Sequence, residues 1–379
     1  MYKDKVVYYA KNNFEKLEEC DGFPIYKLDE TEQFRIKARV DQIRRHDSGM
    51  DSVRSSVLLS LIATYDAVFS DFCKFLLRQN PERYDGAERN FKLKELLSLQ
   101  SIDEIVDKVI DEEVDQLMNR SHADQIGFFE KSFHVKFADT FDRWSEFMEI
   151  FERRNLAAHG DLIVNKIYTA NCMQHGRKDC PALGTKLRIN YSYMEKSLDI
   201  LLEVFIMIAF ATWRKRLPAE ADSAFSMIVE RSFAFLRDGR PNLAQRITEQ
   251  ALKIKDVRCE RITELMLVVN NAIAHRCQGN QDDYMKRLDS IDWSATSPIF
   301  KLCVAAVRGN TDEVCKHVEA AKIADNLGLV DLREWPVFQW VRSDEEFEKA
   351  VLGSFGEPLT KSSTLKADGD LLIIEDDID

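Results

Sequence analysis

The longest regular pattern of apolar residues lies between residues 51 and 78. Its apolar side chains recur at intervals of three and four, which is the spacing of one face of an α-helix. They are Val53, Val57, Leu58, Leu61, Ile62, Tyr65, Val68, Phe69, Phe72, Phe75 and Leu76. The pattern predicts a long helix over 51–78. Ser48-Gly49 before it and Pro81 after it are expected to be breaks.

Helical patterns continue on both sides of this segment. The predicted helices cover 6–17, 30–45, 93–118, 125–159 and 192–216. Two of these segments contain a capping-box sequence, in which a Ser is followed three residues later by a Glu: Ser101 with Glu104, and Ser192 with Glu195. The aromatic residues between 125 and 159 keep helical spacing throughout, so we interpret them as core residues rather than as a cofactor site.

The second half of the chain contains a weak internal repeat. An apolar helix end, a Gly turn and an amphipathic helix recur around Gly239, Gly279 and Gly309, which are 40 and then 30 residues apart. This period is typical of helix-turn-helix solenoids and resembles tetratricopeptide-type repeats. The spacing is uneven, however, and most of the diagnostic Trp, Tyr and Pro positions are missing. The segment 335–352 has the pattern of a closing helix.

These patterns predict an all-α protein, consistent with its scarce Gly (14) and Pro (8). We expect an N-terminal helical extension (1–48), a helical bundle (49–216), a helical repeat domain (217–355) and an acidic, disordered tail (356–379). The joint between the bundle and the repeats is placed at Leu217-Pro218.

The formal net charge of −12 argues against a broad basic surface that would grip duplex nucleic acid, so any contact with nucleic acid requires a local patch. The eight Cys residues are scattered, and the charged start of the chain lacks the apolar stretch of a secretory signal. The most apolar run, 200–213, is too short to span a bilayer. We therefore expect a cytoplasmic protein with free thiols and no membrane partner.

The strongest concentration of chemically capable side chains lies at the end of the helix predicted over 125–159. Arg154, Asn155 and His159 fall within six residues, followed by Gly160. Asn155 and His159 are four apart and share one helical face, with Glu152 about one turn earlier. Arg154 has to bend across to reach the same place.

A cation, an amide and an imidazole around one small site suit phosphoryl chemistry. An Arg binds and neutralises phosphate, and a His can move a proton on or off a ribose 2′-OH or a leaving 5′-oxygen. The structural alternative is that Arg154 is a surface residue and that His159 is a cation favoured at a helix C-terminus.

The segment Arg154-Asn155-Leu-Ala-Ala-His159 resembles the signature of the HEPN superfamily, in which an Arg and a polar residue precede a His on a late helix of a small α-bundle. The helix over 57–77 is similar to the first core helix of that family, with Asp66 where a carboxylate is often found. The irregular segment 160–185 and the helix after it resemble the family's loop and final helix. The resemblance covers roughly residues 50–215.

This resemblance implies metal-independent RNA cleavage, with no cofactor. The His and the Arg act at the scissile phosphate, and the ribose 2′-OH is the internal nucleophile, which leaves a 2′,3′-cyclic phosphate. HEPN domains usually form homodimers that bring two motifs to one cleft, and many serve as toxins or anti-phage (abortive infection) effectors. Others have lost the motif and act as dimerisation modules. Arg153 is a second candidate phosphate ligand.

Three further groups have both a functional and a structural interpretation. Arg177, Lys178, Lys186 and Arg188 form a basic cluster that either guides RNA or is a solvated loop. Cys172, His175 and Cys180 offer three zinc ligands at loose spacing without a paired CxxC, and no metal site is assigned. Asn271 and His275 repeat the Asn-x3-His spacing inside the repeats, where such residues usually make contacts between helices.

Two functions follow from the sequence. The first is a HEPN-type endoribonuclease whose repeat domain binds a regulator or another protein. The second is a non-catalytic adaptor, in which the bundle dimerises and the helical repeats recruit a protein. Toxicity on expression that His159→Ala relieves would favour the first.

Overall fold

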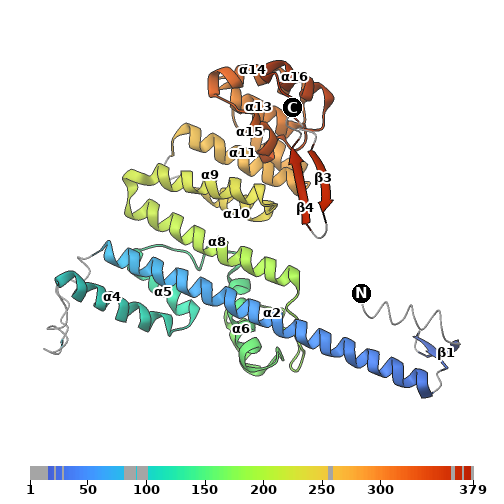
Figure 1. Ribbon diagram of the computed structural model, residues 1–379. Coiled ribbons are helices and arrows are strands. Elements are labelled where there is room, and N and C mark those ends of the chain that lie inside the picture. The colour runs from blue at the N-terminus through green and yellow to red at the C-terminus, as the bar shows by residue number, and fades with distance from the viewer. Residues whose placement is uncertain are drawn as a thin grey trace. The chain divides into compact units, whose positions relative to one another are not determined.

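The structure is a computed structural model that divides the chain into two compact units. It describes residues 16–20, 23–27, 30–80, 91, 101–254, 259–359, 363–368 and 371–376. The first unit comprises Met1–Phe129 and Ala138–Leu201, and the second comprises Glu130–Phe137 and Leu202–Asp379. Both units are predominantly helical (Figure 1), which confirms the predicted all-α class. In the described part, strands occur only in two short antiparallel hairpins.

Helices of the first unit pack around an aromatic core. They are α2 (Glu30–Arg78), α4 (Ile102–Met118), the first part of α5 (His122–Phe133), α6 (Trp144–His159), α7 (Lys166–Gln174) and the first part of α8 (Tyr191–Arg216). Helix α2 packs on α4 and α6, and α6 also packs on α7. The ring of Tyr65 in α2 lies 6.1 Å from that of Phe147 and 6.0 Å from that of Phe151, both in α6. This packing fixes the faces that α2 and α6 turn toward each other.

Helix α2 runs without a break through Ser48-Gly49, so the predicted break there is wrong. A Gly in a helix costs about 1 kcal/mol relative to Ala. The packing of the following turns on α4 and α6 outweighs that cost, and neither residue removes a backbone donor as Pro would. The helix predicted over 6–17 lies outside the described residues, except that Lys16 and Leu17 belong to strand β1 (Lys16–Cys20), which pairs with β2 (Phe23–Tyr26).

The single helix predicted over 125–159 is also wrong, because it is two helices, α5 and α6. His134 adopts a left-handed φ of 56°, and the Val135 backbone N–H donates to the carbonyl of Glu130 at 3.2 Å. Phe137 and Phe141 are buried within the turns that follow. The helical spacing of these aromatic residues therefore reflected their burial in the core and not a continuous helix. No Gly or Pro in the sequence indicated the turn between α5 and α6.

The two predicted N-caps have different outcomes. Ser101 caps α4 as expected, because its Oγ accepts from the backbone N–H of Glu104 at 3.2 Å. Helix α8 begins before Ser192, and the Asn190 side chain accepts from the backbone N–H of Tyr193 at 2.8 Å. The predicted cap at Ser192 is therefore wrong, because Asn190, which the sequence analysis did not consider, is as good an N-cap as Ser and lies earlier in the chain.

Helices of the second unit form pairs joined at glycines. They are α9 (Ala221–Arg237), α10 (Pro241–Leu252), α11 (Arg261–Cys277), α12 (Gln281–Asp289), α13 (Pro298–Arg308), α14 (Thr311–Asp325), α15 (Leu329–Glu334) and α16 (Glu345–Phe355), with short 3-10 turns η2 (Pro218–Glu220) and η3 (Pro336–Phe338). Gly239, Gly279 and Gly309 separate three successive pairs and have left-handed φ values of 72°, 77° and 72°. The turns predicted at these three glycines are present, and α11 contacts α9, α10, α12 and α13.

The boundary between the units falls inside α8, between Leu201 and Leu202, whereas the sequence predicted a joint at Leu217-Pro218. Helix α8 does end at Arg216, directly before that dipeptide. However, Phe210 of α8 is buried in one core with Phe225 and Ile228 of α9. The apolar C-terminal half of α8 therefore belongs to the second unit.

The tail contains a hairpin, so the expectation of disorder is not met over its described residues. Strand β3 (Ser363–Asp368) pairs antiparallel with β4 (Leu371–Asp376). The run Leu371-Leu-Ile-Ile374 in β4 is rich in strand-forming residues, which the acidic composition of the tail concealed.

One helical stretch among the described residues, Gly49–Arg78 in α2, is long and apolar enough to cross a membrane. Length and composition alone give this result, and core helices of soluble proteins meet the same criterion. Leu58, Ile62 and Phe69 of this stretch are buried within the first unit.

Candidate active site

Helix α6 carries the predicted motif and lines two pockets with different faces. Successive residues of a helix point about 100° apart. Arg154 therefore lines one pocket, which we call the Arg154 cleft, while Arg153 lines the other, which we call the Glu149 pocket. The sequence analysis named Arg154 as a phosphate ligand and Arg153 as a second candidate. In the structure the two arginines line different pockets.

The Arg154 cleft has a volume of about 600 Å³ and brings together residues from α2, α5, α6 and the end of α7. Its polar lining includes Asp66, His122, Glu152, Arg154, Asn155 and His175. Four predicted site residues are therefore in one place: Asp66, Glu152, Arg154 and Asn155. Asp66 lies 88 positions before Arg154, and the packing of α2 on α6 joins them.

Arg154 is a cation of this cleft without an ion pair to any described residue, and Arg120 also lines the cleft. It is half-buried, and its Nε is enclosed without a hydrogen-bond partner. Among the residues that the structure describes, its guanidinium forms no ion pair with a carboxylate. An enclosed Nε–H without an acceptor is costly, and a phosphate could accept two hydrogen bonds from the guanidinium at once. The side chain is thus suited to an anionic ligand.

His122 and Asp66 form an ion pair in the same cleft. The His122 Nε2 lies 3.0 Å from Asp66 Oδ1, and the imidazole stacks on the ring of Phe151 with centroids 3.4 Å apart and planes 12° apart. The His122 side chain is 11% exposed, so the ring is held but still reaches the cleft. The sequence analysis missed His122, because 56 residues separate it from Asp66 and no local pattern links them.

Two further contacts shape the opposite wall. The Asn171 side chain of α7 donates to Glu152 Oε2 at 3.0 Å, which ties the start of the motif to the following helix. His175, the C-cap residue of α7, also lines the cleft. Asn155 is exposed, so its amide is available to a ligand.

His159 does not line the Arg154 cleft of its own chain. It is the last residue of α6 and is exposed, and Gly160 ends the helix through its backbone N–H, which donates to the carbonyl of Leu156 at 2.8 Å. The left-handed backbone of Asp161 and Leu162 then turns the chain away. Asn155 and His159 are one turn apart on α6, as their spacing predicts, but only Asn155 reaches the cleft.

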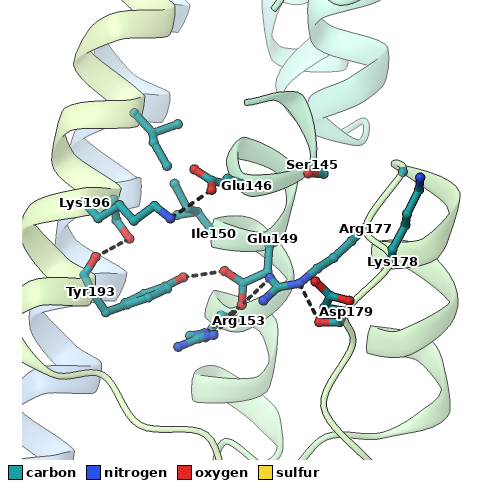
Figure 2. A pocket seen from close by; sticks show the side chains of 13 residues that line it. Ser145, Glu146, Glu149, Ile150, Arg153, Arg177, Lys178, Asp179, Tyr193 and Lys196 are labelled. Carbon is teal, nitrogen blue, oxygen red and sulfur yellow. Dashed lines mark hydrogen bonds and ion pairs between the residues drawn. The ribbon is translucent and has the colours of Figure 1, made fainter. Parts of the chain in front are cut away.

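The Glu149 pocket is built around a buried carboxylate that is already bonded to neighbouring side chains (Figure 2). Arg153 Nε donates to Glu149 Oε1 at 2.8 Å, and its guanidinium carbon lies 3.9 Å from the centroid of the Tyr193 ring. The hydroxyls of Tyr168 and Tyr193 donate to Glu149 at 2.7 and 3.0 Å. Burial, followed by the charge of Glu149, raises the pKa of both tyrosines, so the hydroxyls remain donors. Arg153 therefore has a structural role in the core, where it pairs with Glu149.

The predicted basic cluster is not gathered at the Arg154 cleft. Arg177 and Lys178 line the Glu149 pocket, where Arg177 lies 3.5 Å from a Glu149 oxygen and donates to the carbonyl of Asp179 (Figure 2). Lys186 and Arg188 are exposed on the extended segment that precedes α8. Arg188 contributes its backbone carbonyl, which accepts from Arg153 at 3.1 Å.

The described residues contain no group of three or more His, Cys, Asp or Glu side chains arranged to hold a metal ion. Cys172 is buried, and burial followed by the charge of Glu149 raises the pKa of its thiol to about 12. Cys180 Sγ lies 4.0 Å from the carbonyls of Thr169 and Arg177.

Asn271 and His275 of α11 lie in the second unit and are buried. Asn271 donates to Thr248 of α10 and accepts from Arg287 of α12, while His275 Nε2 lies 3.1 Å from Glu249 Oε1. These residues join three helices, which is the structural interpretation of their spacing.

Comparison with protein-family models, with curated proteins and with solved structures finds no match to this chain. The chemistry of the site therefore has to be argued from its own residues.

Proposed function

We propose that this chain is a metal-independent endoribonuclease of the HEPN type that acts as a homodimer. The observation that carries the proposal is the unpaired, half-buried Arg154 in a cleft that also holds Asn155 and the His122–Asp66 pair. The guanidinium binds the scissile phosphate and neutralises the charge that grows on it during cleavage. Asn155 orients the phosphate or the ribose.

The proposed reaction uses only the ribose 2′-OH and side chains of the two protein copies. The ribose 2′-OH attacks the adjacent phosphorus, the bond from phosphorus to the 5′-oxygen breaks, and a 2′,3′-cyclic phosphate is left. His159 moves a proton in this reaction, and because it is outside the Arg154 cleft of its own chain, it acts at the cleft of a second copy. The dimer is therefore part of the proposal and not an addition to it.

The first experiment incubates the purified full-length protein with tRNA or total RNA, with and without EDTA. We expect cleavage that EDTA does not reduce and products that end in 2′,3′-cyclic phosphate. Arg154→Ala is expected to lower the rate by about 10²–10³-fold, which is typical for loss of a group that stabilises transition-state charge. Arg261→Ala is the matched control, because Arg261 is an exposed arginine of the second unit that pairs with Glu264 and lies outside the cleft.

The same preparation distinguishes the alternative function. If wild type and Arg261→Ala never cleave RNA, and expression causes no toxicity that Arg154→Ala or His159→Ala relieves, the ribonuclease proposal is wrong. A protein that then co-purifies through the second unit would favour the non-catalytic adaptor.

For the second unit we propose a tetratricopeptide-like repeat that binds a regulator or a protein partner. The three helix pairs joined at left-handed glycines support this arrangement. A toxin or anti-phage effector needs such control, because unregulated RNA cleavage harms the cell that makes it.

A further inference from the structure

We infer that His122, held by Asp66, is the general base that takes the proton of the attacking 2′-OH. This inference rests on the proposed function and adds a catalytic residue that the motif does not contain. Three observations carry it: the ion pair with Asp66, the stacking on Phe151, and the shared cleft with Arg154.

The contact with Asp66 fixes which ring nitrogen is free in the neutral imidazole. An ionised carboxylate can only accept, so the Nε2 that lies 3.0 Å from Asp66 carries a hydrogen and Nδ1 keeps its lone pair in the neutral ring. Nδ1 has no hydrogen-bond partner within the described part of the chain. Asp66 also stabilises the imidazolium that forms when Nδ1 accepts a proton, as the carboxylate of a Ser-His-Asp triad does.

The position of the ring agrees with this role. His122 stacks on Phe151, and Arg154 and Asn155 follow Phe151 by three and four residues, so their side chains leave the same side of α6. A phosphate on Arg154 therefore places the neighbouring ribose on the side of the imidazole. Nδ1 takes the 2′-OH proton, the 2′-oxygen bonds to phosphorus, the bond to the 5′-oxygen breaks, and that oxygen receives a proton from His159 of the partner subunit.

The test is chemical rescue. His122→Gly should lower the cleavage rate by about 10²–10⁴-fold, and added imidazole should restore part of it, with more basic substituted imidazoles restoring more. Binding of a non-cleavable RNA with 2′-O-methyl groups should be unchanged, because Arg154 provides the phosphate contact. The matched control is His275→Gly in the second unit, where Nε2 also meets a carboxylate, at 3.1 Å, but outside the cleft.

Asp66 is a positioning residue, and its effect should pass through His122. Asp66→Asn in a His122→Gly background should cause no further loss beyond that of His122→Gly alone. The inference is wrong if His122→Gly cleaves RNA as fast as wild type per folded molecule, or if imidazole does not restore an impaired variant. His122 would then have only a structural role. Loss of cleavage in Arg154→Ala would still support the proposed function. A wild type that cleaves no RNA overturns both.

A separate observation identifies the face through which two copies associate. We infer that α2 pairs antiparallel with α2 of a second copy. From residue 50 to residue 75 the outward face of α2 repeats at alternating intervals of four and three, the spacing of a coiled-coil seam. Its members are Met50, Arg54, Val57, Leu61, Thr64, Val68, Asp71 and Phe75. Met50, Val57, Val68 and Phe75 are 38%, 50%, 45% and 56% exposed.

This face is complementary to itself. A twofold axis between positions 62 and 63 places Val57 opposite Val68 of the partner subunit, and Met50 opposite Phe75 of the partner subunit. The same axis places Arg54 opposite Asp71 of the partner subunit, with opposite charges. The paired stretch is about 38 Å long at the rise of an α-helix. A parallel pair would instead set Arg54 against Arg54 and Asp71 against Asp71, so the charges select the antiparallel arrangement.

Sedimentation equilibrium of the full-length chain tests this interface without any assay of activity. Wild type should be a dimer, Arg54→Asp should dissociate at least tenfold more readily, and Arg54→Asp with Asp71→Arg should restore the dimer. Val57→Glu should give a monomer with an unchanged circular dichroism spectrum. The control Ile167→Glu replaces an apolar side chain on α7 that is 70% exposed. A monomeric wild type, a failed restoration by the double swap, or binding of this face to lipid vesicles would overturn the inference.

Discussion

Two neighbouring arginines show that the surroundings of a residue determine whether its side chain is structural or available to a ligand. Arg153 is held by a buried carboxylate and an aromatic ring, whereas Arg154 is half-buried and only its Nε is enclosed without an acceptor. Their order in the sequence does not distinguish them, since both belong to the same helical turn. The difference comes from packing. Residues of α8 contact α6 on the side of Arg153, and α2 packs on α6 on another side.

This difference predicts unequal effects on stability. Glu149→Ala should lower the free energy of unfolding by about 3–5 kcal/mol, because it leaves the buried charge of Arg153 unpaired and removes the acceptor of two tyrosine hydroxyls. Glu152→Ala removes a half-buried carboxylate with a single hydrogen bond, to Asn171, and should cost about 1 kcal/mol. Urea unfolding followed by circular dichroism measures both. Equal losses would contradict the assignment of Glu149 to the core.

The glycine turns of the second unit allow a second comparison between single residues. Gly309 and Gly239 share a φ of 72°, so Ala at either position should cost about 1–2 kcal/mol in backbone strain. At Gly309 the added Cβ would also lie 3.2 Å from Arg276, whose guanidinium donates to the carbonyls of Ala306 and Val307. Nothing lies within 4 Å at Gly239.

Gly309→Ala should therefore destabilise the protein more than Gly239→Ala does. Thermal unfolding of the two variants and wild type provides the comparison. Equal effects would show that Arg276 moves aside without loss, and a larger effect at Gly239 would contradict the prediction.

At the scale of elements, hydrophobic periodicity predicted most of the helices but not their ends. The long helix over 51–78 and the cap at Ser101 follow from local rules, and both are present. The turn at His134 was missed because its aromatic residues are buried in a loop with helical spacing. The start of α8 was missed because two good caps compete. Helix ends depend on tertiary packing, so the spacing of apolar residues alone does not predict where a helix begins or ends.

The candidate site shows the same limit. The motif placed Arg154 and Asn155 correctly on one helix, and the family resemblance pointed to Asp66, which lies in the same cleft. His122 could not be found, because its importance comes from contacts with α2 and α6 rather than from its neighbours in the chain. Conversely, the spacing of Arg177, Lys178, Lys186 and Arg188 suggested one patch, but their loop divides them between a pocket and an exposed strand-like segment.

The contact between α10 and α11 predicts how the second unit responds to acid. The hydrogen bond from His275 is the largest cause that lowers the pKa of Glu249, from 4.5 to about 2. A carboxylate with a lowered pKa stabilises the fold above its unfolded value near 4.5, and this contribution is lost as pH falls from there toward 2. The Glu249 side chain is 29% exposed, so solvent reduces the effect below that of a fully buried pair.

Glu249→Gln should therefore be less stable than wild type by about 1.5–3 kcal/mol at pH 7, and the difference should shrink below pH 4.5 and be mostly lost by pH 2. Urea unfolding at a series of pH values from 7 down to about 2 tests this. A difference that does not change with pH would mean that the charge of Glu249 contributes nothing and that only its shape matters.

At the scale of the whole molecule, the position of His159 makes the proposed site depend on two chains. Arg154 lines a cleft that His159 of the same chain does not reach. If each cleft combines Arg154 of one copy with His159 of the other, an Arg154→Ala chain and a His159→Ala chain should be inactive alone and active when mixed. Half of the randomly formed dimers contain both chains, and each of those has one complete site out of two. The mixture should therefore recover about one quarter of the wild-type activity.

The controls separate this arrangement from a site within one chain. If Arg154 and His159 of the same chain acted together, no mixed dimer would contain a complete site, and mixing would restore nothing. The Val57→Glu substitution in both chains should abolish the recovery, because it removes the proposed α2 interface while leaving every cleft residue in place. Recovery that persists in those monomers would mean that the two chains meet through another surface, whereas recovery that disappears links the α2 face directly to cleavage.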